Sequence, residues 1–183
     1  MLAALASLVL LQITASAPAQ SRTNRVWARV EQRLAQQNDV WFKDGEFLKN
    51  VQLLKFSFEI NPHSYDVATN LGWMQENVEK YDEALATYIR YKNENPKDKD
   101  SALPEANFYF MRKAYAKVVP LLEPRIKLDP HANCYRLLAH SYERLGLLKD
   151  SKRVWDLYLS RHADDEAAKL NLKRVEKKLK GGS

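Results

Sequence analysis

The chain has 183 residues, 45% of them hydrophobic and 28% charged, a globular composition that excludes an intrinsically disordered protein. Glycine and proline are scarce, with 5 and 7 residues, which argues against an all-β fold and favours long helices joined by short turns. The formal net charge of +6 can attract acidic partners or anionic surfaces, but it is too diffuse to indicate a nucleic-acid partner.

The N-terminal segment carries no charged residue from position 2 to position 19 and has an apolar run at residues 8–11. It ends in Ala-Ser-Ala-Pro-Ala at 15–19, small residues typical of a signal-peptidase site. We expect residues 1–19 to be a signal peptide cleaved after Ala19, which directs the protein to the periplasm or out of the cell. Because no Lys or Arg precedes the apolar run, the alternative is an uncleaved anchor. The run is shorter than the ~20 residues of a membrane-spanning helix, so no transmembrane span is expected.

A repeat of 34 residues follows. Pro62, Pro96 and Pro130 are 34 residues apart, and a proline tends to end a helix just before itself. Two further sets of positions keep the same spacing: Phe47, Tyr81 and Tyr115, and Leu54, Tyr88 and Leu122. Three registers with one period predict an array of similar helical units.

The second unit resembles the tetratricopeptide repeat family, whose period is 34. It has the Leu71-Gly72 step of the first helix, Ala84 in the second helix, and Tyr88 four residues later. The family's aromatic residue three positions after the glycine is replaced by Gln75.

The other units resemble the family less completely. The fourth keeps Leu138-Ala139, Gly146 and Trp155, with its register shifted by one residue after Pro130. The first has Gln-Asn at 37–38 where Leu-Gly is expected, and the third departs at Glu105. The resemblance covers about residues 26–165.

The resemblance implies an all-α, right-handed α-solenoid of four helix-turn-helix repeats. The repeats are expected at about 31–64, 65–98, 99–131 and 132–165, inside one tetratricopeptide repeat domain over 20–180 with a short tail at 181–183. A single repeat cannot bury its apolar face, so at least ~3 are needed for stability. Small residues are expected where the helices come close: Gly72, Ala84, Ala106, Ala139 and Ser151.

Residues 166–180 are expected to form a C-terminal capping helix. Leu172, Val175 and Leu179 recur at helical spacing among lysines, and either Asp164 or Asp165 can cap its N-terminus. The alternative is a basic amphipathic helix that lies on a membrane or on a nucleic acid.

In the family the first helices line a concave groove that binds a protein or peptide. The resemblance implies that the groove of this chain is lined by Phe42, Lys43, Asn70, Trp73, Asn77, Asn107, Phe110, Arg136, His140 and Arg144. The aromatic side chains would form a track and the two arginines a basic end, which suits a ligand with apolar anchors and an acidic end. The alternative for Phe42 and Phe110 is that they turn inward as packing residues.

Residues that carry chemistry are few. His140-x-x-Glu143 is the sharpest candidate for a metal site, but the other histidines lie in turns of different repeats and a site would need at least three ligands. No catalytic or phosphate-binding motif is present, so we expect no enzyme activity, metal or cofactor. The single Cys134 is expected to be a small buried residue, with pairing between chains as the alternative.

The sequence therefore predicts a non-enzymatic scaffold or adaptor that binds a protein segment in its concave groove. The alternative is an accessory or regulatory subunit of an envelope enzyme or assembly complex, docked by its convex face.

Overall fold

A computed structural model describes residues 22–181, so the expected signal peptide lies outside the described residues. Regular structure within 22–181 is entirely helical. The helices are α1 (Arg22–Lys43), α2 (Phe47–Ile60), α3 (Tyr65–Asn77), α4 (Tyr81–Glu94), α5 (Leu103–Met111), α6 (Tyr115–Leu122), the 3-10 helix η1 (Arg125–Leu128), α7 (Ala132–Arg144), α8 (Leu148–Arg161) and α9 (Glu166–Gly181).

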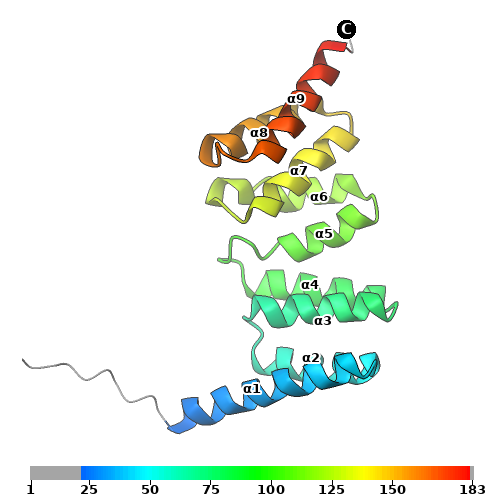
Figure 1. Cartoon of the computed structure of the whole chain (residues 1–183), viewed down its shortest axis with the longest axis vertical. Helices are drawn as coiled ribbons and strands as arrows, with labels where there is room; N and C mark the ends of the chain where they lie inside the picture. Colours follow the sequence, from blue (N-terminus) through cyan, green and yellow to red (C-terminus); the bar gives the residue numbers. More distant parts are fainter. Residues whose placement is uncertain (1–21, 182–183) are drawn as a thin grey trace, which may run out of the picture.

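The helix pairs stack in chain order along one axis, with α1 at one end and α9 at the other (Figure 1). This is the predicted right-handed α-solenoid of four helix-turn-helix repeats with a C-terminal capping helix. α1 begins at Arg22, nine residues before the expected start of the first repeat, and it is longer than the α2 helix on which it packs.

The first helix of every repeat ends in the same way. A residue with positive φ follows each helix: Gly45, Glu79, Lys113 and Gly146, spaced by 34, 34 and 33 residues. At each turn two backbone N–H groups reach back to carbonyls of the helix, as when Glu79 N–H bonds to Glu76 (3.1 Å) and Lys80 N–H bonds to Gln75 (2.8 Å). These are Schellman motifs, which satisfy carbonyls that would otherwise lack a partner at the helix end.

The second helices end where the repeating prolines predict in two of three cases. α2 ends at Ile60 before Pro62, and α4 ends at Glu94 before Pro96. In the third repeat, α6 already ends at Leu122, and a 3-10 turn fills the chain up to Asp129 before Pro130. The additional prolines explain this difference, because Pro120 and Pro124 weaken the helix before the repeating proline is reached.

The buried apolar side chains form three clusters that follow one another along the array. The five small residues expected at close approaches, from Gly72 to Ser151, are all buried. The large residues Tyr88, Leu122 and Trp155 are buried as well. Glu105, the departure noted in the third repeat, is also buried, and Lys92 of α4 pairs with its carboxylate at 2.5 Å. A buried charge is tolerated here because it has an ionic partner.

α9 closes the C-terminal end. Asp165 is the N-cap, since its Oδ1 accepts the Ala168 N–H at 3.0 Å. Val175 is fully buried, and Leu172 and Leu179 pack on the core formed with α7 and α8. Among the described helices, none is both long enough and apolar enough to span a bilayer.

Candidate protein-binding groove

An exposed aromatic cluster lies where α1 and α3 meet. The ring of Phe42 lies 6.0 Å from that of Trp73 and 5.7 Å from that of Phe47, measured between centroids. Trp73 is 50% exposed, and both phenylalanines are exposed too. Two of the three rings proposed for an aromatic track thus come together, and they are joined by Phe47 at the start of α2. The sequence showed Phe47 only as a repeating position.

Phe110, the third ring of that track, is placed differently. It is half-buried, and its ring contacts Tyr115 of α6 edge-on at 5.3 Å. Its neighbour Phe108 is buried and lies 6.3 Å from Tyr88 of the preceding repeat. Phe110 therefore packs within its own repeat, as the alternative reading allowed.

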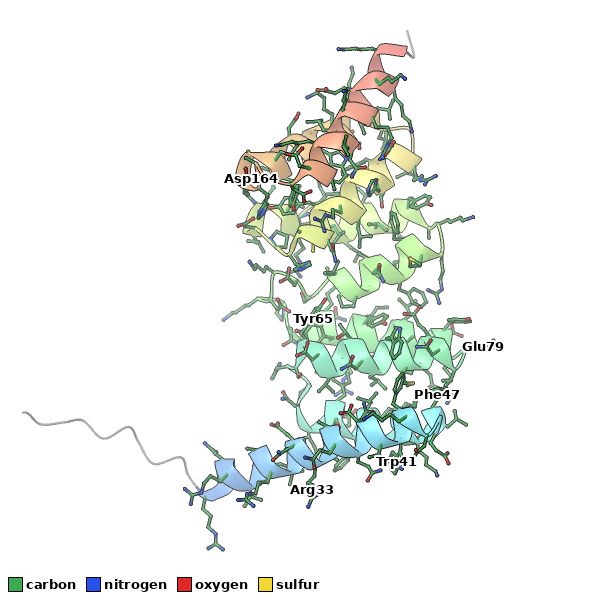
Figure 2. The ribbon with its side chains drawn as sticks, in the orientation of Figure 1. Arg33, Trp41, Phe47, Tyr65, Glu79 and Asp164 are labelled. Carbon is green, nitrogen blue, oxygen red and sulfur yellow. The ribbon has the colours of Figure 1, made fainter. Side chains whose placement is uncertain are left out.

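A hollow of about 460 Å³ runs across the first helices of repeats two, three and four. It brings together Trp73 of α3, Asn107 of α5 and Arg136 of α7. We call it the groove; its other lining residues are Tyr65, Thr69, Glu76, Tyr88, Leu103, Pro104, Asn133 and Leu137. In Figure 2, Tyr65 marks the start of α3 and Glu79 the turn that follows its end. The groove thus contains three of the ten predicted residues, one from each of three repeats.

The three predicted asparagine amides differ in where they lie and in whether they are already hydrogen-bonded. Asn107 is exposed in the groove and its amide makes no hydrogen bond within residues 22–181. Asn70 is equally unbonded but lines a separate hollow of about 350 Å³ between α1, α2 and α3. Asn77 donates its amide to the Trp73 carbonyl of its own helix at 2.8 Å. Of the three predicted amides, Asn107 is therefore the one that lies in the groove with its polar atoms available to a ligand backbone.

Arg136 is already engaged. Its Nη2 lies 2.8 Å from Asp165 Oδ2, and its guanidinium lies over the Tyr158 ring at 5.8 Å. The Ala168 N–H, and after it Arg136, hold the pKa of Asp165 at about 2. The hydrogen bond to Asp165 in turn raises the pKa of Arg136.

The remaining charged candidates lie outside the groove. Arg144 is exposed, forms no ion pair in the described part of the chain, and lies about 12 Å farther along α7, given ~1.5 Å of rise per residue. Lys43 is likewise exposed at the end of α1 and pairs with no described residue.

His140 and Glu143 form the contact between α7 and α9. Glu143 accepts from Arg174 and from Lys178 of α9, each at 2.8 Å. These bonds, Arg174 first, lower the pKa of Glu143 to about 2. His140 is half-buried, with its ring edge-on to Trp155 at 5.2 Å, and this burial lowers its pKa. No group of three metal-ligating side chains is found among the described residues. The packing of α7 against α8 and α9 therefore accounts for the contacts of His140 and Glu143.

No protein-family model matches the sequence, and no curated protein matches it. Solved structures do resemble it. A tetratricopeptide repeat protein from Parabacteroides merdae ATCC 43184 superposes with a TM-score of 0.67 and 19% identity, over 82% of this chain and 60% of that one. One crystal structure of MamA superposes at 0.63 with 14% identity, over 80% of both chains. Another superposes at 0.62 with 14% identity, over 76% of this chain and 82% of that one. The fold is that of a tetratricopeptide-type helical repeat protein.

Proposed function

We propose that the chain is a non-enzymatic scaffold that binds an extended or helical protein segment in the groove across α3, α5 and α7. This proposal rests on one observation: the exposed Trp73 ring and the unbonded Asn107 amide line the same hollow. Aromatic side chains supply much of the binding energy of protein interfaces, and a free amide can bond both an N–H and a C=O of a ligand backbone.

An acidic group of the ligand would be recognised by Arg136. Its side chain is 43% exposed although it pairs with Asp165. A guanidinium has five N–H donors, so it can bind a second carboxylate without losing the first. The lone Arg144 is the other exposed cation of α7 and would extend this preference.

Site-specific photo-crosslinking in the native host tests the groove. A benzophenone amino acid at Asn107 should give a protein adduct that disappears with the second substitution Trp73→Ala. The matched control is the same probe at Asn93, an exposed residue of α4 that makes no hydrogen bond or ion pair with described residues. Circular dichroism checks that Trp73→Ala leaves the fold intact.

An adduct at Asn93 with none at Asn107 would contradict the groove proposal. That result would instead favour an accessory subunit docked by its convex face, on the second helices.

We also propose that the protein acts outside the cytoplasm, because the charge-free apolar segment at 2–19 ends in small residues. Sequencing the N-terminus of the protein from an envelope fraction should give Gln20 as the first residue. A cytoplasmic chain that retains Met1 would contradict export.

A further inference from the structure

The N-terminal end of the array presents an apolar surface to solvent. Val26, Val30 and Val40 of α1 and Leu53 of α2 line a hollow of about 820 Å³, together with Arg29, Arg33, Leu34, Gln36 and Gln37. We call this surface the N-terminal face. Arg33 lies on the side of α1 that points away from the rest of the array (Figure 2). The opposite end of the array is closed by α9, so the two ends differ.

The repeat register shows that the N-terminal face is made of positions that are interior elsewhere. Val40 stands one period before Met74 and two periods before Phe108. Met74 is 2% exposed and Phe108 is 5% exposed, whereas Val40 is 50% exposed. Met74 is buried in a cluster with Val51 of α2, a second helix of the preceding repeat. Within residues 22–181, no second helix of a preceding repeat covers Val40.

Arginines across the repeat junctions follow one polarity, whereas three lysines pair in the opposite sense, from the preceding unit to a carboxylate of the following one: Lys55 with Glu83, Lys92 with Glu105 and Lys152 with Glu176. At all four junctions between described units, an arginine of the following unit pairs with a carboxylate of the preceding unit. The pairs are Arg90 with Glu59 (3.0 Å), Arg112 with Glu76 (3.0 Å), Arg153 with Glu123 (2.7 Å) and Arg174 with Glu143 (2.8 Å). A unit that followed the arginine pattern would bring carboxylates toward the arginines of α1.

Arg29 and Arg33 are the cations that would receive them. Both are exposed beside the apolar floor of the N-terminal face, and neither makes a hydrogen bond or ion pair within residues 22–181. By contrast, the two lysines farther along this end of the array are engaged, since Lys55 and Lys80 both pair with Glu83.

We propose that the N-terminal face docks an acidic amphipathic helix of a partner protein. Its apolar ridge lies on Val30, Val40 and Leu53, where the second helix of a preceding repeat would pack. Its carboxylates pair with Arg29 and Arg33. Helix-in-groove binding of this kind is a common mode of recognition. The site is separate from the groove around Trp73 and does not depend on it.

Three other occupants fit the charges less well. In a symmetric pair of N-terminal faces, arginines would face arginines. In a head-to-tail pair, the lysines of α9 would face the arginines of α1. Residues 2–19 of the same chain contain no acidic residue and offer Arg29 and Arg33 no partner. An anionic membrane could supply the charge, but a bilayer is flat and does not fill a hollow between two helices.

Fluorescence anisotropy with two labelled helical peptides tests the proposal on the full chain. The first probe carries leucines on one face flanked by glutamates, and the second has lysines in place of the glutamates. We expect the glutamate peptide to bind roughly two- to thirtyfold more tightly, the range for two exposed ion pairs, and to lose this advantage at high salt. The variant Arg29→Glu/Arg33→Glu should reverse the preference, and Val40→Asp should weaken both peptides.

The matched control is Lys173→Glu/Lys177→Glu, which changes the net charge equally on the exposed side of α9 and should leave the preference unchanged. Equal binding of both peptides, or the same loss in the control variant, would overturn the proposal. Three further results would also overturn it. A dimer in sedimentation that Val40→Asp abolishes would indicate a second copy of the chain, and peptide binding only after removal of residues 1–19 would indicate that this segment occupies the face. Sedimentation with phosphatidylglycerol vesicles that depends on Arg29 and Arg33, without peptide binding, would indicate a membrane.

Discussion

Gly72 of α3 and Tyr88 of α4 are in direct contact, with the tyrosine ring lying against the glycine backbone. A Cβ atom placed on Gly72 would fall well inside van der Waals contact of Cε1, Cζ and the hydroxyl oxygen of Tyr88. The ring has little freedom to move, because Tyr88 is buried and its hydroxyl donates to Glu76 at 2.9 Å. The Leu-Gly step of the repeat therefore has a steric cause in this chain.

Gly72→Ala should lower the free energy of unfolding by about 1–2 kcal/mol. Overpacking a core typically costs ~1–3 kcal/mol, and the better helix propensity of alanine offsets up to ~1 kcal/mol of that cost. Urea denaturation followed by circular dichroism measures the change.

Two second substitutions separate the clash from other effects of the alanine. In a Tyr88→Leu background the same alanine should cost clearly less, because the ring atoms that meet the Cβ are gone. In a Tyr88→Phe background it should keep most of its cost, since Cε1 and Cζ, the two ring atoms nearest the Cβ, remain. An equal cost in all three backgrounds would refute the steric explanation.

Glu143 should make stability depend on pH in the acidic range. Its pKa in the folded chain is about 2, below the ~4.3 of a free glutamate. A lowered pKa means that its contribution is fully present above about pH 4.3 and is lost as the pH falls toward about 2. Because Arg174 and Lys178 are about half exposed, we expect a contribution of roughly 1–3 kcal/mol.

Glu143→Gln should therefore be less stable than the wild type at neutral pH, and the difference should shrink toward about pH 2. Denaturant unfolding at several pH values measures both. Glu166→Gln is the control, since the only ion pair of Glu166 within residues 22–181 is with exposed Lys169, and it should change stability by less than about 0.5 kcal/mol. A Glu143→Gln deficit that is the same at every pH would show that the ion pairs with α9 are not its cause.

Glu79→Gly should stabilise the array. Glu79 has a φ of 62° at the end of α3, a left-handed conformation that costs a non-glycine residue roughly 1 kcal/mol. Glycine occupies the corresponding turns of repeats one and four. We expect a gain of about 0.5 kcal/mol after the greater flexibility of glycine in the unfolded chain is included. Glu79→Ala keeps the strained φ and should give no gain; a similar gain from both substitutions would indicate that loss of the charge is responsible.

These turns show what the sequence could and could not predict. The 34-residue spacing predicted the array, because each proline and small residue has a local steric effect that every repeat needs. Glu79 and Lys113 take the left-handed turn without being glycine, because the hydrogen bonds of the Schellman motif impose it. Residue type alone did not reveal those turns.

The groove was harder to predict than the fold. Three consecutive residues of α5 are aromatic: Phe108, Tyr109 and Phe110. Contacts with the neighbouring repeat decide which of these three side chains is buried. Phe108 is buried because Tyr88 of α4 lies beside it. The engagement of Arg136 by Asp165 likewise depends on how α9 returns over α7. Such contacts between repeats leave no signal in the spacing of residues along a single sequence.

Cys134 should be unreactive in the folded protein. Its side chain is fully buried, and this burial raises the pKa of the thiol to about 12. The thiolate, which is the reactive form, is therefore nearly absent at about pH 8, and reagents reach the sulfur only when α7 opens. We expect no labelling by Ellman's reagent in native buffer and complete labelling in denaturing urea.

A Ser160→Cys variant, whose added thiol is exposed on α8, should gain one fast-reacting group under the same native conditions. If native Cys134 reacts as fast as that added thiol, the packing around α7 is open in solution and the prediction is wrong. A disulfide-linked dimer of the native protein on a non-reducing gel would likewise contradict it, because Cys134 would then pair between chains.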